Sequence, residues 1–211
     1  MQKNYEDITK EWKNKKYQGK VLEAKYYMYN EHKYYVDNKD VYFNYSNKEK
    51  FVAQWLVKNY GGILLLIPKI DKPNFIKTPD YVYKNNRWDL KTMSQDAISE
   101  KRAVDNVIKN AKNQTDNIIL DITETKLSTK NIINQVIKVY SDPYRKWLNK
   151  IMIIKKYKLI KVFKRKWKPV PPPKITEWAG FSKCNYTLII CYFFRIVNKL
   201  HNFSQNNLTY T

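Results

Sequence analysis

Three ionisable residues in the middle of the chain have the types and the spacing of a metal-dependent hydrolytic site. Asp80 and Asp89 flank a short stretch that contains Asn85-Asn86, and Lys91 follows two residues after the second acid. Two carboxylates can hold a divalent cation such as Mg²⁺ while leaving water on it. The cation lowers the pKa of that water and neutralises charge on a phosphate, and a lysine can orient the nucleophile. We therefore predict Asp80 and Asp89 as metal ligands and Lys91 as the water-positioning residue.

The segment between the two acids is predicted to be a β-hairpin. Aromatic and β-branched residues over 81–83 favour a strand, the alternation resumes after the turn, and Asn85-Asn86 tolerates the left-handed backbone of a two-residue loop. This loop places Asp80 opposite Lys91, with Asp89 on the diagonal. Because side chains alternate between the two faces of a strand, these three residues share one face and the aromatic residues share the other. The two carboxylates and the ammonium group are therefore expected to converge.

The chain around this hairpin alternates between strands and helices. Ser46 and Glu49 have the spacing of a capping box and predict a helix that ends at Gly61-Gly62, with Phe51 in its buried stripe. The apolar run 63–67 predicts a strand in the middle of a sheet, buried on both faces. Further elements are predicted over 103–114 (helix), 117–122 (strand), 130–139 (helix) and 151–163 (strand pair). We therefore expect an α/β fold with a central mixed β-sheet flanked by helices.

Two regions outside this core differ from it in composition. Residues 1–45 combine a polar lead-in, expected to be loosely helical or poorly ordered up to residue 23, with short aromatic runs that predict two or three small strands. Interleaved tyrosines and lysines can stack bases, but we expect these aromatic residues mainly to pack. Pro169 and the prolines at 171–173 predict a stiff linker, which leaves 46–168 as the predicted nuclease-like domain.

The C-terminal extension over residues 169–211 has no assigned role. Its apolar run, 186–197, is interrupted by Arg195 and is shorter than the roughly 20 residues that a membrane span needs. This run has the composition of an extra strand or helix, or of a surface that contacts a membrane or a partner. Membrane contact by the extension is left open.

Composition narrows the class of function. The formal charge of +21, from 40 Lys and Arg against 19 Asp and Glu, favours a polyanionic partner, although part of the excess is ordinary for a lysine-rich composition. The two cysteines (Cys184 and Cys191) and two histidines (His32 and His201) give no basis for a disulfide framework, a zinc site or a histidine triad. The first residues contain no apolar segment of a secretory signal, which predicts a cytoplasmic location.

The motif Pro79-Asp80 with Asp89-Leu90-Lys91 resembles the PD-(D/E)xK nuclease signature, and the longer run from Glu49 to about Asp121 resembles the C-terminal tRNase domain of CdiA-type contact-dependent inhibition toxins. The resemblance implies a restriction-endonuclease-like core and a metal-dependent endonuclease that cleaves RNA, tRNA in particular. Mg²⁺ is the implied cofactor, with Mn²⁺ or Zn²⁺ as alternatives, and no small-molecule cofactor is implied. It also implies Glu49 as a third metal ligand and Gln114, in the following helix, as a residue near the scissile phosphate.

If the toxin resemblance holds, the partners are nucleic acid and an acidic immunity protein that covers the basic face, and the domain is delivered into the cytoplasm of a target cell. Three functions remain open at this stage. The first is an RNA endonuclease toxin. The second is a DNA endonuclease of restriction or repair type, which would use the same residues. The third is a nucleic-acid-binding module without catalytic activity, which would hold RNA equally well in the presence of a chelator.

Overall fold

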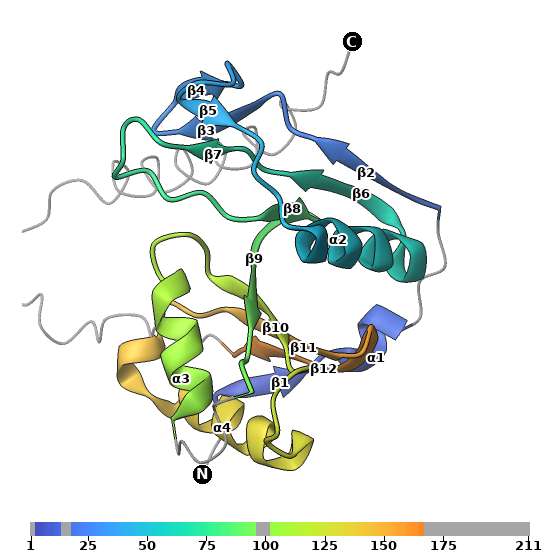
Figure 1. Cartoon of the computed structure of the whole chain (residues 1–211). Helices are drawn as coiled ribbons and strands as arrows, with labels where there is room; N and C mark the ends of the chain where they lie inside the picture. Colours follow the sequence, from blue (N-terminus) through green and yellow to red (C-terminus); the bar gives the residue numbers. More distant parts are fainter. Residues whose placement is uncertain (1–2, 14–17, 96–101, 167–211) are drawn as a thin grey trace, which may run out of the picture. The chain divides into compact units, whose positions relative to one another are not determined.

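A mixed sheet runs through the described part of the chain, which the computed structural model gives for residues 3–13, 18–95 and 102–166 (Figure 1). Eight strands form the sheet, in the order β1-β12-β11-β10-β9-β8-β6-β2. Their bounds are, in that order, Tyr5–Asp7, Lys158–Arg165, Lys150–Lys155, Asn117–Asp121, Asn86–Thr92, Tyr81–Tyr83, Gly62–Leu66 and Gly19–Glu23. The predicted linker and the C-terminal extension over 169–211 lie outside the described residues.

Parallel and antiparallel pairs both occur in this sheet. β10 pairs in parallel with β9 on one side and with β11 on the other, and β2 pairs in parallel with β6. The remaining pairs are antiparallel. Every residue of β10 is buried, as expected for a central strand that is covered on both faces. The predicted α/β fold with a central mixed sheet is confirmed at this level.

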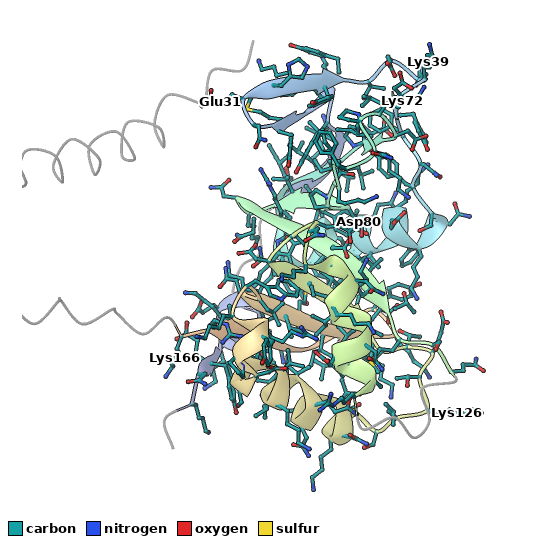
Figure 2. All side chains as sticks on the ribbon, turned by 90° about the vertical axis from the view of Figure 1, so that its left-hand side faces the viewer. Glu31, Lys39, Lys72, Asp80, Lys126 and Lys166 are labelled. Carbon is teal, nitrogen blue, oxygen red and sulfur yellow. The ribbon has the colours of Figure 1, made fainter. Side chains whose placement is uncertain are left out.

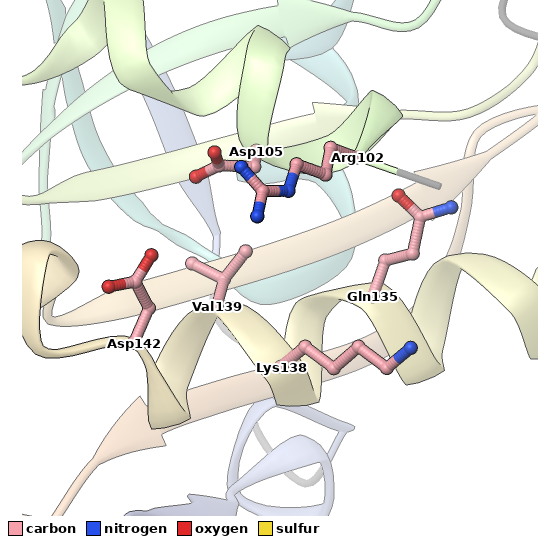
Figure 3. A pocket seen from close by; sticks show the side chains of 6 residues that line it. All are labelled: Arg102, Asp105, Gln135, Lys138, Val139 and Asp142. Carbon is pink, nitrogen blue, oxygen red and sulfur yellow. The ribbon is translucent and has the colours of Figure 1, made fainter. Parts of the chain in front are cut away.

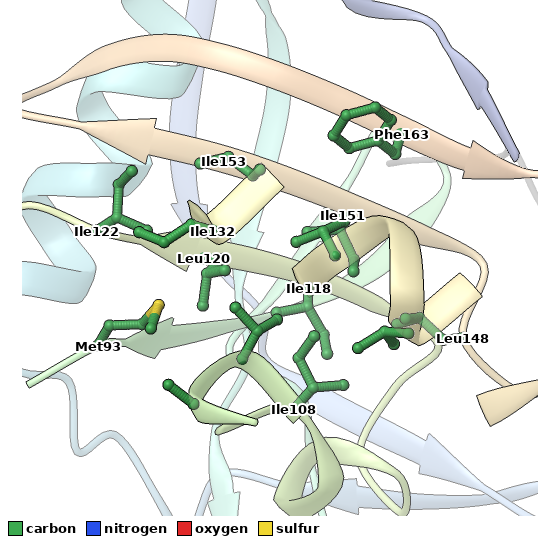
Figure 4. Close-up of a cluster of buried hydrophobic side chains, with 14 of the residues drawn as sticks. Met93, Ile108, Ile118, Leu120, Ile122, Ile132, Leu148, Ile151, Ile153 and Phe163 are labelled. Carbon is green, nitrogen blue, oxygen red and sulfur yellow. The ribbon is translucent and has the colours of Figure 1, made fainter. Parts of the chain in front are cut away.

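Helices cover both faces of the sheet. α1 (Thr9–Lys13) and α2 (Asn47–Tyr60) pack on one face, and α3 (Ala103–Ile108) and α4 (Thr129–Ser141) pack on the other. Because side chains alternate along a strand, Ile118 and Leu120 of β10 join the core under α3 and α4 (Figure 4), whereas Ile119 joins the core under α2. The 3-10 helices η1 (Lys109–Ala111) and η2 (Pro143–Arg145) follow α3 and α4. None of the described helices is long and apolar enough to cross a membrane.

The N-terminus of α2 has the predicted capping box. The Ser46 hydroxyl accepts a hydrogen bond from the Glu49 N–H, and the Glu49 carboxylate accepts one from the Ser46 N–H. The prediction of Phe51 in the buried stripe is wrong, since its side chain is 49% exposed and its ring lies against that of Tyr157, with centroids 4.4 Å apart and the planes tilted by 45°. The helix is rotated so that its face toward the sheet carries Val52, Ala53, Leu56, Val57 and Tyr60.

Two predictions for the strands need correction. The described residues up to Glu23 contain the edge strands β1 and β2, with α1 between them, where a loosely helical or poorly ordered lead-in was predicted. β1 pairs with β12 and β2 pairs with β6, and both partner strands come much later in the chain. The run 63–67 does not form a strand buried on both faces: β6 lies next to the edge strand β2, and Ile63 is 61% exposed. Leu65, on the same face as Ile63, is half-buried, so this face of β6 is covered only in part, which the apolar run did not reveal.

The aromatic runs form the small strands that the sequence predicted. β3 (Tyr26–Tyr29) pairs with β4 (His32–Tyr35), and β5 (Val41–Tyr42) pairs with β7 (Lys69–Ile70). Tyr27 is buried in a third core, which it forms with Val41, Ile67, Ile70 and Ile76. Val82 of β8 packs against this third core. The small strands therefore lie against the face of β8 that carries Val82.

Candidate active site

The predicted hairpin is formed by β8 and β9, but its register differs from the prediction. Tyr81 pairs with Trp88, Val82 with Arg87, and Tyr83 with Asn86, so the turn residues are Lys84 and Asn85 and not Asn85-Asn86. Both turn residues have positive φ angles, 50° and 56°, as a two-residue hairpin turn of this kind requires. Because the register moves by two residues, each side chain stays on its predicted face. Continued by one pair, the observed register sets Asp80 opposite Asp89, whereas the prediction set Asp80 opposite Lys91.

The aromatic face of the hairpin fixes it to helix α2. The Tyr81 hydroxyl donates to the Glu49 carbonyl (2.9 Å) and the Tyr83 hydroxyl donates to the Gly61 carbonyl (2.6 Å), at opposite ends of the helix. Lys84 Nζ donates to the Tyr60 carbonyl (2.9 Å), one of the C-terminal carbonyls that lack a partner within a helix. These contacts explain why Lys84 enters the turn. They also hold the opposite face of the hairpin, which carries the acids, in a fixed position.

Asp80 lies directly before β8 and is half-buried. Its Oδ2 accepts a hydrogen bond from the Leu90 N–H at 2.6 Å, so the side chain bonds to the backbone of the facing strand. Burial and the nearby charge of Asp89 raise the pKa of Asp80 to about 8, and Glu49 adds to this effect. The Leu90 hydrogen bond and Lys91 act in the opposite direction. Asp80 therefore lies in a concentration of negative charge that the protein alone compensates only in part.

Asp89 is almost completely enclosed, with 1% of its surface exposed. Burial raises its pKa, against the lowering effects of Lys91 and of a hydrogen bond with Asp80. Oδ2 of Asp89 lies 2.5 Å from Lys91 Nζ, so this buried oxygen is ion-paired with Lys91. Lys91 therefore compensates the buried charge of Asp89, at the position from which it could also reach a bound water.

Lys91 contacts a second candidate residue as well as Asp89. Its Nζ donates to Oε1 of Gln114 at 3.3 Å, and Nε2 of Gln114 donates to the Thr78 carbonyl at 3.4 Å. Gln114 follows η1 in a turn, since α3 ends at Ile108, earlier than the helix predicted over 103–114. The structure thus brings Asp80, Asp89, Lys91 and Gln114 together. The Gln114 amide links the Lys91 ammonium to the backbone just before Asp80.

Glu49 has a different position. Its carboxylate closes the capping box at the start of α2, with the Ser46 N–H 2.5 Å from Oε2. It is close enough to raise the pKa of Asp80 and of Asp89. Among the described residues, no group of three or more His, Cys, Asp or Glu side chains is arranged to hold a metal ion. A direct metal contact by Glu49 therefore stays a prediction.

The donor set fits a hard cation with oxygen ligands. Mg²⁺ is commonly bound by one or two carboxylates, together with water and substrate phosphate, and does not need a cage made of protein groups alone. Asp80, directly before β8, and Asp89, in β9, supply two neighbouring carboxylates, and the Leu90 N–H donates to Oδ2 of Asp80. The chemistry and placement of these two residues match such a site.

Several contacts at the site were not predicted from the sequence. The Leu90 N–H that holds Asp80 and the Thr78 carbonyl that holds Gln114 are backbone groups, which leave no signal in residue type.

An ion pair between distant elements was not predicted either. Lys48 of α2 contacts the buried Asp121 at the end of β10, with Nζ 2.8 Å from Oδ2. Only the tertiary fold brings Lys48 to Asp121. The sequence shows them as a surface lysine and a strand-end acid.

A pocket of about 370 Å³ lies elsewhere, between α3 and α4 (Figure 3). It is lined by Arg102, Asp105, Gln135, Lys138, Val139 and Asp142. Asp105 forms a two-pronged ion pair with Arg145, whose Nε and Nη2 lie 2.5 and 3.0 Å from the two carboxylate oxygens. None of the predicted site residues lines this pocket, so the candidate active site is a separate place in the fold.

Comparisons with known proteins agree with the resemblance seen in the sequence. Residues 77–160 match the family described as the contact-dependent growth inhibition CdiA C-terminal domain. A solved structure, the CdiA-CT/CdiI toxin and immunity complex from Burkholderia pseudomallei, is 24% identical, with 54% of this chain and 80% of that chain covered and a TM-score of 0.41. The comparison with curated proteins gave no match. The matched segment contains Asp80, Asp89, Lys91 and Gln114, but begins after Glu49. Residues 77–160 are therefore similar in sequence to the CdiA C-terminal domain family.

Proposed function

We propose that this protein is a metal-dependent endonuclease of the PD-(D/E)xK type that cleaves RNA, with tRNA as the expected substrate. The observation that carries the proposal is the pair of facing acids, Asp80 and Asp89, with Lys91 Nζ 2.5 Å from the buried Oδ2 of Asp89. Paired carboxylates with an adjacent ammonium group suit the hydrolysis of a phosphodiester bond. RNA, as opposed to DNA, is supported by the sequence resemblance to the CdiA-type tRNase domains.

The side chains have separate tasks in this proposal. Asp80 and Asp89 would hold a divalent cation, expected to be Mg²⁺, which when bound lowers the pKa of water and offsets charge on the phosphate. Lys91 donates a hydrogen bond to the attacking water and orients it toward phosphorus. Gln114 accepts from Lys91 and donates to the Thr78 carbonyl, so it fixes the direction in which the ammonium group points. Gln114 is therefore proposed as a positioning residue.

Positive charge supports a nucleic-acid substrate. The formal charge of +21 attracts a polyanion over long distances, and contacts between lysines and phosphates make binding sensitive to salt. We expect the affinity for RNA to fall steeply as the salt concentration rises. The cleavage rate at saturating RNA should depend less on salt, because salt screens buried charges such as the paired acids much less than exposed ones.

The toxin assignment adds two expectations. The domain acts in the cytoplasm of a target cell after delivery, and the producing cell contains an immunity protein that blocks it. The net charge of this chain favours an acidic immunity protein, since opposite charges speed association. Co-expression with such a protein should be required for normal growth of the producing cell.

A panel of substrates tests the proposed function. The full chain is incubated with total tRNA, with other RNA and with duplex DNA, in Mg²⁺ or in chelator, beside Asp89→Ala. We expect RNA cleavage that requires the metal and is lost in the variant. Metal-dependent cleavage of DNA alone would identify a restriction or repair type of enzyme. Binding without any product in every condition would show a nucleic-acid-binding module and refute the catalytic proposal.

A further inference from the structure

The loop that leads from β7 to Asp80 is anchored on both sides of an exposed aromatic ring. At its start, the Asp71 N–H donates to the Asp40 carbonyl (2.8 Å), and the Tyr42 hydroxyl lies 3.1 Å from each carboxylate oxygen of Asp71. Further along, Ile76 is buried, with 2% of its surface exposed, and its N–H donates to the Pro73 carbonyl (3.2 Å). The backbone between these two anchors, residues 72–75, is therefore held at both ends.

Phe75, directly before the buried Ile76, has a side chain that is 66% exposed. A single exposed apolar residue is ordinary on a protein surface and needs no explanation by itself. Phe75, however, is not isolated: its ring lies against that of Tyr29, with centroids 6.3 Å apart and an angle of 59° between the planes. Tyr29 in turn packs against the third core. The Phe75 ring is thus supported from one side and open on the other.

Two exposed basic residues flank Phe75 in the sequence. The Lys72 side chain is 76% exposed, with Nζ 3.6 Å from Asp40, and Lys77 is also exposed. Exposed aromatic rings between lysines are the usual surface for binding a single strand, because the bases stack on the rings while the lysines contact the backbone phosphates.

The ring lies in the loop that leads to the candidate active site. Asp80 is the fifth residue after Phe75, so the two Cα atoms are at most about 18 Å apart. The Thr78 carbonyl, in the same loop, accepts the hydrogen bond from Gln114 that fixes Lys91. Figure 2 labels Lys72 in this loop and Asp80 at its end. A single strand bound at Asp80 can therefore reach the Phe75 ring.

We propose that Phe75, supported by Tyr29, is a stacking subsite for an unpaired base of the RNA strand next to the cleaved phosphate, with Lys72 and Lys77 on the adjoining phosphates. This inference rests on the proposed function for its substrate. Stacking on one ring requires a base that is not already paired within a helix, so the subsite selects single-stranded segments, such as loops, over duplex RNA.

Binding measurements on RNA that is not cut test this subsite. The full chain with Asp89→Asn is held in chelator, and fluorescence anisotropy gives its Kd for a short single-stranded RNA and for a duplex RNA. Phe75→Ala should weaken single-stranded binding by about 5- to 100-fold, as expected for one lost stacking contact. Phe75→Trp should restore it, and duplex binding should be unchanged in both variants. The matched control is Tyr144→Ala, which removes a ring that is 82% exposed in η2 and should alter neither Kd.

Three results would overturn the subsite: a Phe75→Ala protein that binds single-stranded RNA like its parent, an equal loss for duplex RNA, or a parent that does not bind single-stranded RNA. The unfolding temperatures of the variants show that each is folded. Cleavage is scored separately, in wild-type protein with Mg²⁺. If wild-type protein cuts nothing while Phe75→Ala still weakens single-stranded binding, the subsite stands and the nuclease proposal fails. If wild-type protein cleaves RNA and Phe75→Ala binds normally, only the subsite fails.

Discussion

Asp80 and Asp89 face each other across the β8–β9 hairpin, and the Leu90 N–H, which follows Asp89 in the chain, donates to Oδ2 of Asp80 at 2.6 Å. This backbone hydrogen bond keeps the two acids close together although the charge of Asp89 raises the energy of the ionised form of Asp80. A protein without a bound cation pays for this arrangement in stability, which makes the cost measurable.

Replacing Asp80 with Asn should stabilise the metal-free protein at high pH. The pKa of Asp80 is raised from 3.8 to about 8, so between these values the folded protein holds a proton that the unfolded chain has released. Stability is therefore fully present below pH 4 and falls as the pH rises toward 8. Asn has no such charge, and in chelator at pH 8 the unfolding temperature of Asp80→Asn should exceed that of wild type by several degrees.

Thermal unfolding at pH 5 and pH 8 measures this difference, which should be smaller at pH 5. Glu124→Gln is the matched control, because it removes a charge from a side chain that is 53% exposed and should change little. An Asp80→Asn protein that is less stable than wild type at both pH values would show that the facing acids do not repel each other as described.

Lys91→Ala should reduce RNA cleavage by about 10²- to 10³-fold, the usual cost of losing a group that stabilises the transition state. The ammonium group contacts Asp89 and is proposed to orient the attacking water, so kcat should fall far more than RNA affinity. Single-turnover cleavage and anisotropy measure the two effects separately. Lys109→Ala, an exposed lysine of η1, is the control for lost charge. Equal losses in both lysine variants would mean that Lys91 acts only through its charge.

Gln114→Ala should slow cleavage by about tenfold, while KM remains close to that of wild type. The side chain does not need to touch the substrate for this effect, because it holds Lys91 at 3.3 Å and is itself held by Thr78. Gln114→Glu keeps the acceptor for Lys91 but loses the donor to Thr78, so its cleavage rate should lie between those of wild type and Gln114→Ala. The exposed neighbour Asn113→Ala provides the comparison. A rise in KM with unchanged kcat in Gln114→Ala would indicate a substrate contact and contradict a positioning role.

Substitution in the hairpin turn tests the left-handed backbone conformation of Asn85. Asn85 has a φ of 56°, so Asn85→Val should cost about 1–2 kcal/mol of stability, and Asn85→Gly should be tolerated. Asn74→Val is the control, because Asn74 is exposed in a loop and is not among the residues with positive φ. Urea unfolding gives the differences. Tolerance of valine at residue 85 would argue for a different turn.

The hairpin shows which features could be predicted from the sequence. The alternation of apolar and polar residues over 80–91 predicted both strands and the face of each side chain, since that pattern has a period of two. The register could not be predicted in the same way. It depends on where the turn begins, and Lys84 enters the turn with its ammonium group on the Tyr60 carbonyl, a contact from a distant helix.

The rest of the fold follows the same division. Strand β10 and helices α2 and α4 were predicted because each carries a strong local pattern or cap. The edge strands β1 and β2 were missed because their polar residues gain strand structure only by pairing with β12 and β6. At the site, residue types and spacing predicted Asp80, Asp89 and Lys91 as a group, and the family resemblance added Gln114. The backbone donors and acceptors that hold them carry no signal in the sequence.

Binding of a divalent metal to Asp80 and Asp89 is the central claim, and titration calorimetry with Mn²⁺ on the full chain tests it without any substrate. Mn²⁺ prefers the same oxygen ligands as Mg²⁺. Wild-type protein should bind the metal with a measurable enthalpy, Asp80→Asn and Asp89→Asn should each bind it much more weakly, and Glu124→Gln should bind it like wild type. Equal binding by wild type and by the Asp80→Asn/Asp89→Asn double variant would contradict the account, because the metal would then lie elsewhere.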